Sequence, residues 1–207
     1  MMGPYWGVCT LVICKPVIRR NAEVGDWIVG TGSKRFGFEN KVVYAMEVTQ
    51  KLTMEEYDAY CQKELQNKIP KWDSNIYEKI VGDCIYDFSV TPSLLRASVH
   101  NEGNRPIDLG GKYALLSDHF YYFGNKPIQL PENLLEIVKQ GQGHKSTSNN
   151  PYFHPFIDWI ITRKEAKNIV FSEPQDKHLF EFDRNCLSRC AVRNKINDEA
   201  DEELGDE

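Results

Sequence analysis

The sequence predicts an α+β domain, in which a small mixed or antiparallel β-sheet, or a partly open barrel of the same strands, carries flanking helices. Short apolar runs of strand length fill the first 50 residues and recur at residues 113–123. Segments with helical periodicity lie at residues 53–66 and 151–160. Because strands and helices do not alternate regularly, a doubly wound parallel sheet is disfavoured.

Three strands are expected in the N-terminal quarter. Residues 7–14 (GVCTLVIC) form an apolar, β-branched run, residues 26–30 (DWIVG) a second, and residues 42–49 (VVYAMEVT) a third. Residues 15–23 are expected to form a polar bend. Residues 34–41 suit a hairpin-like loop between the second and third strands.

The first helix has the clearest start signal. Thr53 and Glu56 are spaced as in a capping box, so a helix is expected from there to about Gln66. Pro131 and Pro151 open two further short helices. The last helix carries apolar residues at i, i+3, i+4 and i+7, which predict a core-facing stripe: Phe153, Phe156, Ile157 and Ile160.

The rest of the chain is less regular. Residues 70–104 are expected to be irregular except for a strand near 84–88, and residues 113–123 to form a strand or strand pair. These elements predict one domain over residues 1–175. Residues 176–207 are expected to be a charged extension with an acidic, disordered tail.

Charge is unevenly distributed. The net charge is −5, but the last twelve residues carry seven carboxylates and no lysine or arginine, so residues 1–195 carry +2. A nearly neutral body does not suit a strong non-specific DNA binder. Contact with a single nucleotide is the more reasonable expectation, and the 12% aromatic content supplies flat surfaces for stacking on bases.

Six cysteines are scattered through apolar or mixed segments: Cys9, Cys14, Cys61, Cys84, Cys186 and Cys190. With no signal peptide and no apolar run of membrane-spanning length, they are expected to be reduced thiols in a cytoplasmic protein that does not contact a membrane. The Cys186–Cys190 spacing is too weak to predict a metal site, and no cofactor is expected. The oligomeric state cannot be predicted.

The first candidate binding block joins a basic pair to a glycine-rich strand end. Arg19, Arg20 and Asn21 precede Trp27, and the strand ends in Gly30-Thr31-Gly32-Ser33. Backbone amides, hydroxyls and guanidinium groups suit phosphates and bases. The alternative is an ordinary turn with solvated arginines, since neither a P-loop lysine nor a Rossmann helix follows.

The second block is Ser117-Asp118-His119-Phe120-Tyr121-Tyr122, where titratable groups adjoin aromatic rings. Asp118 and His119 could bind a base edge or exchange a proton. However, adjacent strand residues point to opposite faces, and the aromatic rings could belong to the core instead.

The third block, Gly141–Ser146, places His144 and Lys145 in a polar loop that could close over a ligand or remain a plain surface loop. Cysteine–histidine catalysis from Cys14 or Cys84 is possible in principle. No spacing in the sequence supports it.

These residues also resemble a known family. The run from Gly7 to Thr53, the segment Leu116–Gly124 and the pair Gly143-His144 resemble the nucleotide modification associated domain 2 family, across most of residues 4–160. Such domains are associated with systems that modify nucleic-acid bases. The order Arg-Asn, Gly-Asp, strand also resembles the EVE branch of the PUA-like fold, a small β-barrel whose members hold a modified base in an aromatic pocket.

The resemblance implies a protein that binds a nucleobase, a nucleotide or nucleic acid with a modified base. Its site would join the arginine block to Ser117, Asp118, His119, Tyr122, His144 and Lys145. The alternative is an enzyme acting on a nucleotide or base with Asp118, His119 and His144 as acid–base groups. A third reading is a protein-interaction module. Family members carry a strand ahead of the segment matching Gly3–Trp6, so one sheet edge is expected to be bare here, unless the start is misassigned.

Overall fold

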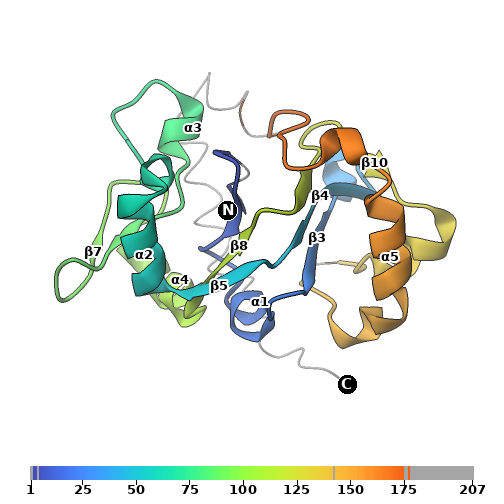
Figure 1. Ribbon diagram of the computed structural model, residues 1–207, viewed down its shortest axis with the longest axis horizontal. Helices are drawn as coiled ribbons and strands as arrows, with labels where there is room; N and C mark the ends of the chain where they lie inside the picture. The colour runs from blue at the N-terminus through green and yellow to red at the C-terminus, as the bar shows by residue number, and fades with distance from the viewer. Residues whose placement is uncertain (1, 4, 142, 175–176, 178–207) are drawn as a thin grey trace.

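The computed structural model describes residues 2–3, 5–141, 143–174 and 177. Their strands form antiparallel sheets, none of which closes into a barrel (Figure 1). The first sheet has the order β1 (Met2–Gly3), β2 (Cys9–Leu11), β8 (Tyr113–Ser117), β5 (Gln50–Thr53). The second has the order β10 (Ile128–Gln129), β4 (Lys41–Glu47), β3 (Trp27–Thr31), with β9 (Phe120–Tyr122) also paired to β4. A third pairs β6 (Tyr86–Asp87) with β7 (Leu94–Leu95). The predicted α+β class is confirmed.

Helices flank these sheets. They are α1 (Pro16–Asn21), α2 (Met54–Lys63), α3 (Tyr77–Ile80), α4 (Arg105–Gly110) and α5 (Phe153–Ile160). Single 3₁₀ segments lie at Lys34–Phe36, Gln66–Lys68, Glu102–Asn104, Glu132–Ile137, Thr147–Tyr152 and Lys164–Ala166. In Figure 1, α2, α3 and α4 lie on the side of the first sheet and α5 lies beside the second. Among the described residues, no helix has the length and apolar character needed to cross a bilayer.

A bent two-stranded ribbon joins the two larger sheets. The chain passes from β4 into β5 and from β8 into β9. On one side of the bend β4 pairs with β9, and on the other side β5 pairs with β8. At the bend itself, the Thr49 N–H donates to the Leu116 carbonyl at 2.9 Å and the Glu47 N–H to the His119 carbonyl at 3.1 Å. The bend therefore fixes Glu47 and His119 side by side.

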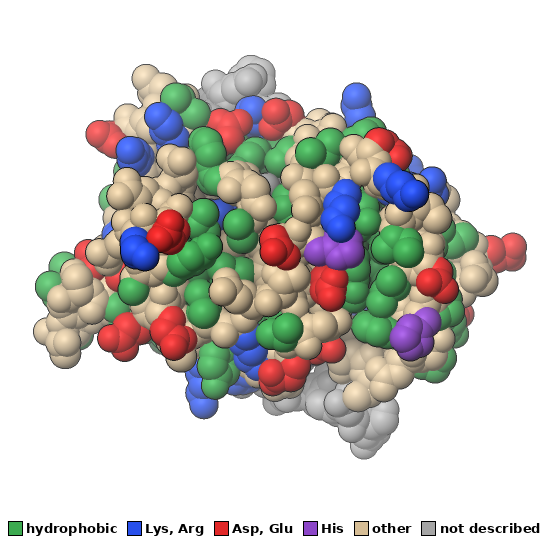
Figure 2. Space-filling view, in the orientation of Figure 1, with side chains coloured by type: hydrophobic (Ala, Val, Ile, Leu, Met, Phe, Trp, Pro, Cys, Tyr) green, Lys and Arg blue, Asp and Glu red, His purple; other side chains and the backbone are tan. Residues whose placement is uncertain are grey.

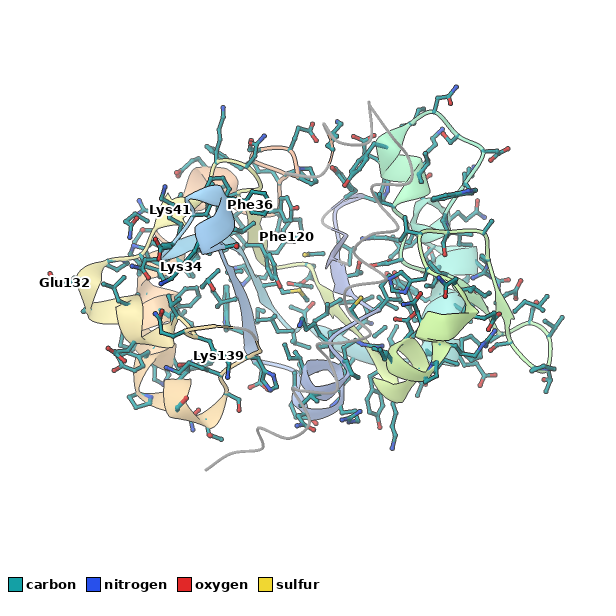
Figure 3. All side chains as sticks on the ribbon, turned by 180° about the vertical axis from the view of Figure 1, so that it is seen from behind. Lys34, Phe36, Lys41, Phe120, Glu132 and Lys139 are labelled. Atoms are coloured by element: carbon teal, nitrogen blue, oxygen red, sulfur yellow. The ribbon has the colours of Figure 1, made fainter. Side chains whose placement is uncertain are left out.

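Each larger sheet has its own core. On α2, Met54, Tyr57 and Cys61 are buried against the first sheet. On α5, Phe156 and Ile160 are buried over the second sheet, whereas Phe153 is exposed. A third cluster lies between them and includes Phe120, which Figure 3 shows pointing into the interior.

A buried charged network ties α2 to β2. Asp83 accepts from the Thr10 hydroxyl at 2.5 Å and from the Tyr57 hydroxyl at 2.7 Å. The Lys68 ammonium donates to Thr10 Oγ1 at 2.9 Å and to the Val8 carbonyl at 2.8 Å. Burial lowers the pKa of Lys68. Because every polar group named here is hydrogen-bonded to another, the network stabilises the fold, and no ligand is needed to explain its burial.

The capping box at the start of α2 is confirmed. The Thr53 hydroxyl accepts from the Glu56 N–H at 3.2 Å, and the Glu56 carboxylate accepts from the Thr53 N–H at 2.8 Å. Thr53→Ala is therefore expected to lower the free energy of unfolding by about 1 kcal/mol. Urea denaturation measures this loss, and Thr53→Ser, which keeps the acceptor, is the control. An alanine variant as stable as the control would contradict this account.

Several elements differ from the sequence expectations. Residues 15–23 contain α1 rather than only a polar bend, because Pro16 suits the first helical position and Arg19 is buried behind it. Residues 50–53 form β5 although they have little apolar character. Their partner strand β8 supplies the buried side chains of this strand pair. Residues 70–104 contain α3 and the β6–β7 pair.

The remaining differences concern the ends of the predicted elements. The helix after Pro131 is a 3₁₀ segment, Glu132–Ile137. One sheet edge was expected to be bare, and in the structure the short strand β1 pairs with β2 at the edge of the first sheet. The Cys186–Cys190 pair and the acidic tail lie outside the described residues, so the predicted boundary near residue 175 remains a prediction.

Candidate functional site

The two halves of the first predicted block lie apart. Arg19, Arg20 and Asn21 belong to α1, just before β3 begins, whereas Gly30-Thr31-Gly32-Ser33 lies at the far end of β3. A five-residue strand spans about 16 Å. The structure therefore does not bring these two groups around one hollow.

Arg19 is buried rather than lining an opening. Its guanidinium donates to the carbonyls of Cys14 (2.8 Å), Tyr113 (3.0 Å), Ile107 (3.4 Å) and Asp108. Burial lowers its pKa to about 10. The side chain thus joins these backbone segments inside the protein, and we call it the Arg19 clamp. Neighbouring Arg20 is half-buried and donates to the Gly110 carbonyl at 3.0 Å.

The glycines of the strand end serve packing. A Cβ on Gly30 would lie 2.1 Å from the Tyr44 ring, and one on Gly32 would lie 2.3 Å from Phe38 Cβ. Both positions therefore require glycine, because a larger residue would collide with these neighbouring side chains. Figure 3 shows Lys34, Phe36 and Lys41 grouped around this hairpin end.

The second and third blocks are also dispersed. Ser117 is buried, and its hydroxyl bonds the backbone of His119, so it shapes the turn between β8 and β9. Asp118 is exposed, and Tyr122 is buried and stacked on Tyr44 with centroids 6.5 Å apart.

His144 and Lys145 follow the 3₁₀ segment Glu132–Ile137, and the Lys145 ammonium donates to the Glu136 carbonyl. The predicted acid–base group of Asp118, His119 and His144 stays a prediction. Among the predicted residues, the structure brings together Trp27 and His119, whose ring centroids are 5.2 Å apart.

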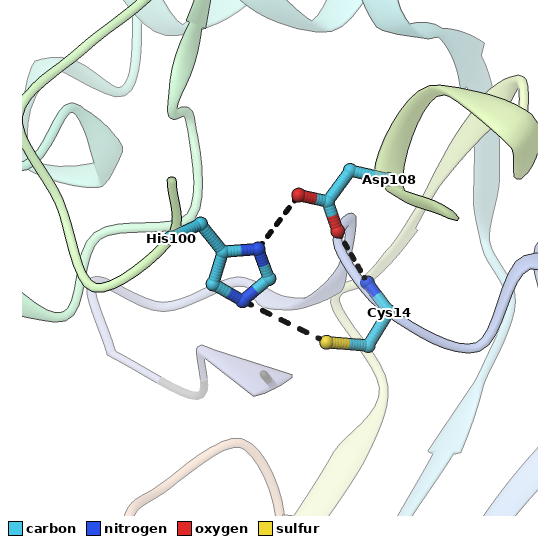
Figure 4. Close-up of side chains that lie close together, drawn as sticks. All are labelled: Cys14, His100 and Asp108. Carbon is cyan, nitrogen blue, oxygen red and sulfur yellow. Dashed lines mark hydrogen bonds and ion pairs between the residues drawn. The ribbon is translucent and has the colours of Figure 1, made fainter. Parts of the chain in front are cut away.

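A different cluster of reactive groups lies at the other end of β8. The Cys14 Sγ is 3.8 Å from His100 Nε2, and His100 Nδ1 is 2.6 Å from Asp108 Oδ2 (Figure 4). Asp108 also accepts from the Cys14 N–H at 3.1 Å and from the Tyr86 hydroxyl at 3.1 Å. The His100 imidazole thus connects the Cys14 thiol to the Asp108 carboxylate, which has three hydrogen-bond partners.

The backbone at Cys14 is strained. Cys14 and Lys15 have φ values of 59° and 45°, in the left-handed region that non-glycine residues rarely adopt. Each such residue costs about 1–3 kcal/mol, and such strain clusters at functional sites. The Asp108 carboxylate on the Cys14 N–H and Arg19 on the Cys14 carbonyl hold this turn.

Charge separation is favoured within the cluster. Burial raises the pKa of Cys14, but the hydrogen bond from His100 and nearby positive charge outweigh it, so the pKa is lowered. Burial lowers the pKa of His100, yet its bonds to Asp108 and Cys14 dominate and raise it from 6.5 to about 9. Both shifts favour the thiolate–imidazolium pair over the neutral thiol–imidazole pair.

Metal binding is the other chemistry open to this trio. The ligand atoms of Cys14, His100 and Asp108 lie within 4.8 Å of one another. However, the Asp108 carboxylate already accepts from His100, which leaves Cys14 and His100 as direct ligands. A structural zinc site needs four, and no other His, Cys, Asp or Glu of the described chain joins the group. Thiol chemistry fits the donor set better.

Sequence reasoning missed His100 and Asp108. They lie 86 and 94 residues from Cys14, and no spacing motif marks them. The available signal was positional: Cys14 ends an apolar strand directly before a Lys-Pro helix start, which is a place where strand-to-helix turns present a nucleophile.

The fold and the cluster define an α+β protein with a buried thiol–imidazole–carboxylate arrangement. The family model described as nucleotide modification associated domain 2 matches residues 2–181 of the 207, so the chain belongs to this family and has a nucleotide-modification-associated role. No curated protein and no solved structure matches the chain.

Proposed function

We propose that this protein is a thiol-dependent enzyme that acts on a nucleotide or nucleobase derivative, with Cys14 as the nucleophile. The observation that carries the proposal is the single imidazole of His100, which contacts the Cys14 sulfur through Nε2 and the Asp108 carboxylate through Nδ1. A nucleophile, a base and a group that orients the base are the three parts of a covalent catalytic triad.

The arrangement suits acyl transfer. The Cys14 thiolate would attack the carbonyl carbon of an acyl group, and the C–N or C–O bond to the leaving group would break. The Nε2 proton of His100 would pass to the leaving nitrogen or oxygen. Water would then attack the Cys14 thioester, give one proton to His100 and release the carboxylic acid, which restores the thiolate–imidazolium pair.

Asp108 would keep the imidazole oriented. Its carboxylate accepts a hydrogen bond from the Nδ1–H group of His100, so the Nε2 side of the ring faces the sulfur. Tyr86 donates to the same oxygen of Asp108 and limits its movement. The nucleotide part of the substrate follows from the family, whose members are associated with nucleotide modification. This assignment differs from the acid–base group expected at Asp118, His119 and His144, which stays a prediction.

Selective labelling tests the proposal. A small electrophile such as iodoacetamide, applied to the folded protein at neutral pH and followed by peptide mass spectrometry, is expected to modify Cys14 before Cys9, Cys61 and Cys84. These three thiols are more buried, and burial raises the pKa of Cys9 to about 12. The Cys14→Ser variant is the control, since its labelling should fall to the background of the other thiols. Equal labelling of Cys14 and Cys9 would refute a reactive Cys14.

A further inference from the structure

A row of three side chains crosses the second sheet at the bend of the ribbon. Trp27 on β3 pairs directly with Glu47 on β4, and the Glu47 N–H bonds the His119 carbonyl. Residues opposite each other on neighbouring antiparallel strands point to the same face of the sheet. The side chains of Trp27, Glu47 and His119 therefore stand together.

The neighbouring row on that face is apolar. It consists of Val29, Ala45 and Tyr121, which lie two residues further along the same three strands and so share the face. Ala45 and Tyr121 are buried in the core that α5 covers. The polar row thus occupies the rim of an otherwise apolar face, where packing alone does not call for a carboxylate and an imidazole.

The row is partly open to solvent. The side chains of His119 and Glu47 retain 23% and 33% of their exposure, and Trp27 is half-buried. The Trp27 ring meets Phe156 of α5 at 6.2 Å in an edge-to-face contact, which marks where the helical cover ends. Figure 2 shows histidine, acidic and basic side chains gathered near the middle of one face.

The polar groups are held in fixed directions. Glu47 Oε2 lies 2.8 Å from His119 Nδ1, and the His119 ring lies edge-on to Trp27, with an interplanar angle of 76°. The Tyr121 hydroxyl lies 3.5 Å from His119 Nε2 on the other side of the imidazole. The half-buried Trp27 indole, which also stacks on Tyr121 with ring centroids 6.3 Å apart, therefore adjoins a carboxylate of fixed orientation, and a base would contact the solvent-exposed part of the indole.

We infer that Trp27, Glu47 and His119 form a binding site for a nucleobase that carries an exocyclic amino group. The base stacks on the indole, as bases do on aromatic side chains in single-strand binding proteins. Its amino group donates to the Glu47 carboxylate, the pairing by which acidic side chains select cytosine. His119 holds that carboxylate in place through the Nδ1 contact.

This site is separate from Cys14 and goes beyond the proposed enzyme activity. Arg19, which clamps the Cys14 turn, bonds the carbonyl of Tyr113 at the first residue of β8, whereas His119 follows Ser117 at its last. The five residues of β8 span about 16 Å. Base recognition can accordingly succeed or fail independently of the thiol chemistry.

Matched nucleosides provide the test. Calorimetric titration at millimolar nucleoside, together with quenching of tryptophan fluorescence, compares cytidine with uridine, which carries a carbonyl where cytidine carries the amino group. Cytidine is expected to bind the full chain at least about fivefold more tightly than uridine. Glu47→Gln should remove the preference, and Trp27→Leu should weaken both nucleosides and remove most of the quenching.

Two further variants separate the outcomes. Trp159→Phe changes an indole outside the row and should leave the cytidine preference intact. Cys14→Ser should bind as the wild type does, so that failure of the thiol hypothesis and failure of the base site are told apart. If cytidine and uridine bind equally to the wild-type protein and to Glu47→Gln, or if neither binds, the base site does not exist.

Discussion

Replacement of His100 by glutamine is expected to move the pH dependence of Cys14 alkylation to higher pH. In the native protein, the hydrogen bond and charge of His100 help to hold the pKa of Cys14 below its ordinary value of 9.0. Without the imidazole, the desolvation that raises this pKa loses a main opposing contribution. The thiolate, which is the reactive form, then appears only at higher pH. At pH 7 the thiolate fraction, and with it the alkylation rate, should therefore fall.

The measurement is the alkylation rate as a function of pH, followed by mass spectrometry of the Cys14 peptide. The midpoint of the profile is the readout, because a small cavity near the sulfur changes the amplitude of the rate but not its midpoint. His119→Gln, at the far end of β8, is the control and should leave the midpoint unchanged. A His100→Gln profile that overlies the native one would remove His100 from the proposed mechanism.

Replacement of Arg19 by methionine is expected to lower the free energy of unfolding by about 3 kcal/mol, because each buried carbonyl left without a donor costs about 1–3 kcal/mol. The guanidinium donates to the carbonyls of Cys14, Tyr113, Ile107 and Asp108, all in the protein interior. Methionine fills part of the volume but leaves these acceptors without their donor. Urea denaturation followed by circular dichroism measures the loss.

Arg20→Met is the matched control on the same helix. Arg20 is half-buried and donates to the Gly110 carbonyl. A surface substitution of this kind is expected to cost less than about 1 kcal/mol. Equal losses for the two variants would mean that the clamp contributes little. If Arg19→Met folds, its Cys14 alkylation profile further tests whether the clamp positions the thiol.

The clamp connects stability with the proposed chemistry. Arg19 bonds the carbonyls of both Cys14 and Asp108, so the residue that carries the thiol and the residue that orients the imidazole share one fixed support. The left-handed turn at Cys14 and Lys15 would relax to an extended or helical conformation without such support. The positions of Cys14 and Asp108 therefore depend on the buried Arg19 guanidinium, which does not itself contact the Cys14 sulfur.

The local elements and the class of fold could be predicted from the amino-acid sequence. The strand periodicity at residues 26–30 and 42–49 corresponds to β3 and β4, and the capping box at Thr53 marks the start of α2. These signals are readable because apolar periodicity and end-capping are properties of a few adjacent residues. Family membership was also readable, since it depends on ordered blocks of sequence.

The contacts between residues distant in the sequence could be identified only in the three-dimensional structure. Arg19 looked like a solvated or ligand-binding arginine, yet four carbonyls from three segments make its burial favourable. Cys14 and His100 are 86 residues apart and become neighbours at 3.8 Å because α1 packs against α4 and both α1 and β2 contact β8. Packing of this kind depends on non-local burial and hydrogen bonding, which leave no periodic trace along the chain.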